Sequence, residues 1–238
     1  MRGIAARQTL KAFGTQTVMV GAMDGFQLVV VLSTTAILML SVVLAGLLTL
    51  DYMRGRRRSH IFWSAGMWLF SFGVLLETLF ALGIYSNALI GLYLFVVALL
   101  VEMLAMGSMQ LIASRLLKRL YAVFVVVISA FVAYSVAVSH FPNIIQTYVV
   151  FGPLPLLVVV FSSLATFPAV AILIIIALLS YSRRHSYRMA SIIIGVIVVS
   201  VAGTLYIAAM PEFLYISEFI GILLLWLGFV DFKVLRGR

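Results

Sequence analysis

The chain has 238 residues, of which 65% are hydrophobic, carries a formal net charge of +9 and contains no cysteine. A mean hydropathy of +1.24 excludes an ordinary water-soluble core and indicates a protein embedded in a lipid bilayer. The missing cysteine excludes disulfides, thiolate metal sites and cysteine nucleophiles. Because most of the positive charge lies between apolar stretches, the expected partners are anionic lipid headgroups and not nucleic acid.

The first 25 residues predict an amphipathic segment that lies on the membrane surface. Arg7 and Lys11 occupy one helical face. Apolar or small side chains recur at helical spacing on another face, at Ala6, Leu10, Phe13, Thr17 and Val20. We therefore expect an interfacial segment over 1–25, followed by a single transmembrane domain over 26–238.

Seven apolar stretches are each long enough to cross a bilayer, which requires roughly 20 residues of helix. They are residues 26–50, 61–83, 88–112, 120–139, 149–181, 189–210 and 213–232. The fifth stretch is over-long and contains three prolines, so its helix is expected to begin near 154–157 and to kink at Pro168. The predicted fold is an all-α integral membrane protein, a bundle of seven transmembrane helices.

Clusters of basic residues follow every second apolar stretch and predict the orientation of the bundle. The connections in between, around 86–87, 141–143 and 210–212, contain neither lysine nor arginine. The clusters contain Arg54, Arg56, Arg57, Arg58, Arg115, Lys118, Arg119, Arg183, Arg184, Arg188, Lys233, Arg236 and Arg238. By the positive-inside rule, the N-terminus is expected outside the cell and the C-terminus in the cytoplasm.

This order of helices also permits a parallel repeat of three helices, one connecting helix and three more. The Arg57-Arg58 pair then matches Arg183-Arg184. The seven-helix orientation resembles that of microbial rhodopsins, and the 3+1+3 order resembles SWEET-type sugar transporters. The rhodopsin resemblance implies a retinal-binding lysine deep in the last helix, but Lys233 lies at its cytoplasmic end. No retinal or other cofactor is therefore expected.

Three glutamates within the apolar stretches are the candidate ion- or substrate-binding residues: Glu77, Glu102 and Glu218. A carboxylate in hydrocarbon is costly, so each is a functional candidate. Counted from the outer ends of their helices, Glu77 and Glu218 lie roughly 8–9 Å deep and Glu102 roughly 15–20 Å deep. They are expected to form a descending path, or else to bond individually to hydroxyl groups of neighbouring helices. The polar residues expected near them are Thr78, Tyr93, Thr204, Gln110 and Asp231.

Nothing in the sequence indicates an enzyme or a metal site. The three histidines, His60, His140 and His185, all lie at the ends of predicted spans, where they cannot ligate a metal or haem deep in the bundle. No nucleophile elbow, zinc-protease motif or phosphate-binding loop occurs. Catalytic residues are accordingly not predicted.

Two functions remain open on the sequence. The glutamates and the proline-interrupted fifth helix favour a small-solute transporter or a cation or proton pathway. The alternative is a seven-helix sensor or receptor-like module, or a membrane subunit of a larger complex that docks through the arginine clusters. Small residues at Gly66, Ser191, Gly195 and Gly203 predict close helix approach, within the bundle or between the protomers of a homo-oligomer.

Overall fold

The computed structural model describes residues 25–55, 58–141, 145–146, 149–150, 152–184 and 211–229, with a few positions between 187 and 198. The predicted surface segment 1–25, apart from Gly25, lies outside the described residues. So do most of the predicted sixth span, 189–210, and the end of the chain from residue 230.

Within the described residues the chain folds into six helices and one very short strand pair. The helices are α2 (Gly25–Gly55), α3 (Arg58–Ala81), α4 (Asn87–Met109), α5 (Arg115–Val138), α6 (Leu156–Arg184) and α8 (Pro211–Phe229). Helices α2 to α6 are long and apolar enough to cross a membrane, whereas the apolar part of α8, Tyr215–Gly228, is shorter. The chain is therefore an all-α, multi-pass membrane protein.

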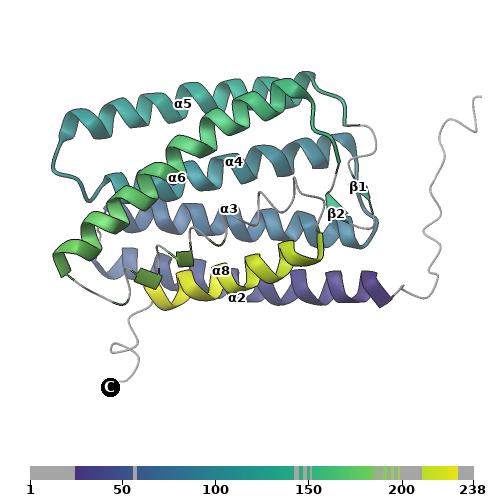
Figure 1. Ribbon diagram of the computed structural model, residues 1–238, viewed down its shortest axis with the longest axis horizontal. Coiled ribbons are helices and arrows are strands. Elements are labelled where there is room, and N and C mark those ends of the chain that lie inside the picture. Colours follow the sequence, from purple (N-terminus) through teal and green to yellow (C-terminus); the bar gives the residue numbers. More distant parts are fainter. Residues whose placement is uncertain are drawn as a thin grey trace, which may run out of the picture.

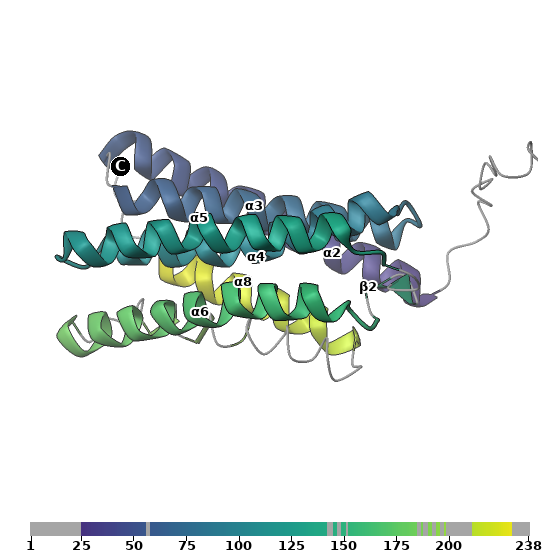
Figure 2. The same ribbon diagram turned by 90° about the horizontal axis from the view of Figure 1, so that it is seen from above.

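Helices α3 and α4 form the centre of the bundle. Helix α2 packs against α3 and α8, while α4 packs against α3, α5 and α6. Figure 1 shows the helices running along the long axis of the molecule, with α6 crossing the others obliquely. Figure 2 shows α6 and α8 together on one side of α4 and α5. We call the end that carries Arg54, Arg58 and Arg115 the basic end and the opposite one the far end.

The turn between α3 and α4 shows why a helix ends within an apolar run. Gly83 has a φ of +81°, a conformation that costs glycine little. Its N–H donates to Phe80 O at 2.9 Å, and Ile84 N–H donates to Leu79 O at 2.9 Å. These two bonds form a Schellman motif, which satisfies the last carbonyl groups of α3.

Helices α4 and α5 both begin at serine caps that hydropathy does not reveal. The Ser86 side chain accepts a bond from Leu89 N at 3.2 Å, and that of Ser114 accepts one from Leu117 N at 3.4 Å. Such caps satisfy backbone N–H groups that have no partner within the helix. Helix α5 consequently begins at Arg115, five residues before the start of the predicted apolar stretch.

The segment before α6 contains a short antiparallel pairing of β1 (Ile145–Gln146) with β2 (Val149–Val150). Helix α6 then begins at Leu156, which confirms the predicted start near 154–157. Pro168 lies inside α6 and the helix continues through it. Because proline has no backbone N–H, it leaves the carbonyl one turn earlier without its helical partner.

Glycines allow α3 and α4 to approach each other closely, as predicted for Gly66. A Cβ atom on Gly66 would lie 2.8 Å from Leu104 Cδ2, and one on Gly107 would lie 2.3 Å from Trp63 Cδ1. The Trp63 indole therefore packs directly on the α4 backbone. Near α8, a Cβ on Gly195 would lie 3.2 Å from Gly221 O, so the predicted close approach holds there too.

The outer helices carry the apolar surface that a bilayer covers. Side chains along one face of α5 are exposed: Leu116, Leu120, Val123, Val127, Phe131, Tyr134 and Val138. Their spacing of three or four residues is that of one helical face. Because lipid tails are as apolar as these side chains, such exposure is stable in a membrane and would not be in water.

Candidate functional site

Glu77 on α3 is buried near the far end and is bonded to Tyr93 on α4. The side chain of Glu77 is only 7% exposed. Tyr93 Oη donates a hydrogen bond of 2.5 Å to Glu77 Oε1. The bond joins the two central helices four residues before the end of α3, or about 6 Å along its axis. Tyr93, one of the polar residues expected near the glutamates, thus contacts Glu77.

Glu218 on α8 comes together with Glu77. The two carboxyl groups are close enough for their charges to interact. Tyr215, one helical turn earlier on α8 and buried, interacts electrostatically with both. Helices α3, α4 and α8 thus bring Glu77, Glu218, Tyr93 and Tyr215 into one cluster, which we call the paired site.

The paired site holds two carboxyl groups without a positive partner in the described part of the chain. Glu77 Oε2 and Glu218 Oε2 are both buried and accept no hydrogen bond from any described residue. No described lysine, arginine or histidine forms an ion pair with either group. Two ionised carboxylates at short range in a low-dielectric interior repel strongly. A bound positive charge, either a proton or a small cation, would remove that repulsion.

Glu102 lies elsewhere, between α4 and α5. It is only 1% exposed, and Ser129 Oγ donates a bond of 2.6 Å to Glu102 Oε2. Tyr121, nearer the start of α5, interacts electrostatically with Glu102. Glu102 follows the first residue of α4 by fifteen positions, or about 22 Å, so it lies deeper than the predicted 15–20 Å. We call Glu102, Ser129 and Tyr121 the single site.

An apolar layer separates the two sites along α4. Tyr93 of the paired site and Glu102 of the single site are nine residues apart, about 13 Å along the helix axis. Between them Val96, Ala98 and Leu100 are all buried. The three predicted glutamates therefore form two clusters and not one.

The other predicted polar neighbours take different roles. Thr78 Oγ1 donates to Val74 O of its own helix at 2.9 Å. Gln110 caps the end of α4, where its carbonyl oxygen accepts a bond of 3.0 Å from Lys118 Nζ. Thr204 and Asp231 lie outside the described residues. Within the structure described, neither Thr78 nor Gln110 hydrogen-bonds to a glutamate.

Three residues of the two sites were not predicted as neighbours of the glutamates: Ser129, Tyr121 and Tyr215. Tyr215 precedes Glu218 by three residues, a spacing that places two side chains on one helix face. The sequence could therefore have predicted Tyr215 as a neighbour of Glu218. The partners of Glu102 on α5 could not be predicted in this way, because they depend on how α4 and α5 are staggered.

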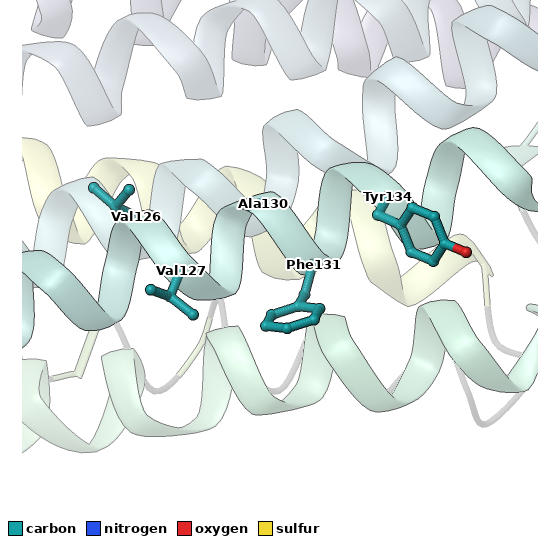
Figure 3. Close-up of a pocket in the computed structure, with 5 residues that line it drawn as sticks. All are labelled: Val126, Val127, Ala130, Phe131 and Tyr134. Carbon is teal, nitrogen blue, oxygen red and sulfur yellow. The ribbon is translucent and has the colours of Figure 1, made fainter.

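A groove of about 510 Å³ on the outer face of α5 lies apart from both sites. It is lined by Val126, Val127, Ala130, Phe131 and Tyr134. Figure 3 shows Phe131 pointing toward α6, where its ring stacks on Phe161 with the ring centroids 5.2 Å apart. The groove has an almost entirely apolar lining, with Tyr134 Oη as its one side-chain oxygen, too few ligands for a hard cation. The groove is therefore part of the apolar surface that a bilayer covers.

No group of three or more metal-ligating side chains occurs among the described residues. Comparisons of the chain with protein-family models, with curated proteins and with solved structures find no match.

Proposed function

We propose that the chain is a small membrane transporter that carries a proton or another small cation, with Glu77 and Glu218 as its binding pair. The observation that supports this most directly is the approach of two carboxyl groups from different helices, each with a buried oxygen and neither with a described cationic partner. A protein that needed these residues only for stability would be expected to pair them with a positive side chain. A pair left without one can accept a positive charge and release it.

The position of the paired site suits uptake from one side of the membrane. Glu218 follows the first residue of α8 by seven positions, about 10 Å, so both carboxyl groups lie in the third of the bundle nearest the far end. We propose that this end faces outward and that the basic end lies in the cytoplasm, against anionic lipid headgroups. The seven-span arrangement predicted from the sequence, with 189–210 as its sixth span, is part of this proposal.

Flux measurements on the purified protein in liposomes test this function. One arm imposes a pH gradient and follows an internal pH dye, and the other imposes sodium or potassium gradients. Glu77→Gln and Glu218→Gln are each expected to abolish the flux that the wild type shows, because either change removes one half of the pair. Asp51→Asn changes a carboxyl group near the basic end of α2 and is the matched control, expected to retain wild-type flux.

Flux that persists unchanged in both glutamine variants would contradict the proposal. The arginine clusters would then favour the alternative of a sensor module or a subunit of a membrane complex.

A further inference from the structure

The single site contains two buried polar atoms that no described residue satisfies. Glu102 Oε1 and Tyr121 Oη are each buried without a hydrogen-bond partner, in side chains that are 1% and 7% exposed. Leaving such groups unsatisfied in a protein interior is destabilising, because their bonds to water are lost and not replaced. Both atoms belong to residues that interact electrostatically across the α4 and α5 interface.

We propose that Glu102 is a proton-binding residue and that water between α4 and α5 connects it to Tyr121, which forms the exit toward the basic end. This inference rests on the proposed function, because it adds a second proton-binding site to the same pathway and identifies the transported charge as a proton. The paired site receives the proton near the far end, and the single site passes it on from the middle of the bundle.

The oxygens available favour a proton over a metal ion. Hard cations such as Ca²⁺ and Mg²⁺ collect about six or more oxygen ligands. The single site offers one carboxyl group and the hydroxyl groups of Ser129 and Tyr121, while helical carbonyls are engaged in backbone bonds. A buried water needs about two to four polar partners, which Glu102 Oε1 and Tyr121 Oη begin to provide. One carboxyl group with two hydroxyl groups therefore suits one proton and water.

The position of Tyr121 gives the pathway its direction. Tyr121 follows Arg115, the first residue of α5, by six positions, which places it about 9 Å from the basic end of that helix. It is the titratable group that faces Glu102 from α5. On α3 and α6, the other helices packed against α4, no described charged side chain interacts with Glu102.

The transfer itself is a balanced exchange of one proton. When Glu102 releases its proton, the carboxyl O–H bond breaks as an O–H bond forms on the adjacent water. That water passes a different proton to Tyr121 Oη, which releases its own hydroxyl proton toward the basic end. The water and Tyr121 are then neutral again, and Glu102 is left as a carboxylate. Ser129 Oγ–H donates to the other carboxyl oxygen and stabilises this negative state.

Infrared difference spectroscopy of the full chain in lipid tests the inference directly. A protonated carboxyl group buried in the bundle has a C=O stretching band that an ionised one lacks. Glu102→Gln, which conserves volume, is expected to remove one such band, and Tyr121→Phe is expected to shift it and to slow its exchange in D₂O. Tyr134→Phe is the matched control, because Tyr134 lies on the exposed face of the same helix.

Two results would overturn the inference. One is a spectrum in which Glu102→Gln removes no carboxylic acid band, and the other is a Tyr121→Phe spectrum identical to that of Tyr134→Phe. Flux separates this failure from failure of the proposed function. If Glu77→Gln abolishes proton flux but Glu102→Gln leaves it intact, the exit pathway is wrong and the transporter stands. If both spectral effects occur in a protein without any flux, the proton site stands and transport is wrong.

Discussion

The paired site and the single site use the same side chain in two different settings. At the paired site, the carboxyl group of Glu77 on α3, bonded to Tyr93 on α4, interacts with that of Glu218 on α8 near the far end. At the single site, Glu102 is alone between α4 and α5 and deeper in the bundle. The difference shows that partners and position decide what a buried glutamate can do. Two close carboxyl groups compete for one positive charge, whereas an isolated one can hold a proton of its own.

The largest effect is expected from a substitution between α3 and α4 that disrupts the paired site and leaves the single site intact. Gly107→Val places side-chain atoms where the Trp63 indole packs, 2.3 Å from the position of the new Cβ. Overpacking of this kind costs about 3 kcal/mol and should push α4 away from α3. Flux should be lost because Tyr93 and Glu77 lie on these two helices, while the Glu102 band should persist because its partners are on α5.

Unfolding in mixed micelles measures the loss of stability, liposome assays measure the loss of flux, and infrared spectroscopy shows whether the Glu102 band persists. Gly73→Ala is the control at the same interface, since its Cβ would meet neighbouring atoms only at 3.9 Å. Equal loss of stability in the two variants would show that α3 and α4 are not tightly packed at Gly107.

A smaller effect is expected for Tyr93→Phe, which removes the hydrogen bond to Glu77 and keeps the ring. A hydrogen bond to a charged group contributes about 1.5–3 kcal/mol, so the free energy of unfolding should fall by about 2 kcal/mol. Tyr85→Phe changes a half-exposed tyrosine near the far end and should have little effect. If the two variants unfold alike, the contact between Tyr93 and Glu77 does not stabilise the bundle.

The smallest effect is expected for Ser129→Ala at the single site. Hydrogen bonds between transmembrane helices contribute about 0.6 kcal/mol on average, and a protonated Glu102 should follow that average. Ser162→Ala is the control, because Ser162 Oγ bonds Val158 O of its own helix. Unfolding measurements should show a loss smaller than that of Tyr93→Phe. A loss larger than that of Tyr93→Phe would indicate that Glu102 is ionised in the resting protein.

Five of the seven predicted spans correspond in place and order to the long helices α2 to α6, because the length of an apolar run is set by the thickness of the bilayer. It was less accurate at their ends. Helix α3 ends at a glycine turn and α5 begins at a serine cap, and both are fixed by local hydrogen bonds that hydropathy does not report. The predicted count of seven and the predicted orientation stay predictions.

The sequence by itself determined that the chain lies in a membrane and that Glu77, Glu102 and Glu218 are the carboxyl groups to consider within its apolar runs, since charge there is costly wherever it occurs. Only the tertiary structure decided which of them meet. Glu77 and Glu218 are distant in the chain and come together because α3 and α8 both pack against α2, while the stagger of α4 and α5 brings Ser129 to Glu102. Apolar periodicity places a residue on a helix face, but the packing of neighbouring helices determines what that face contacts.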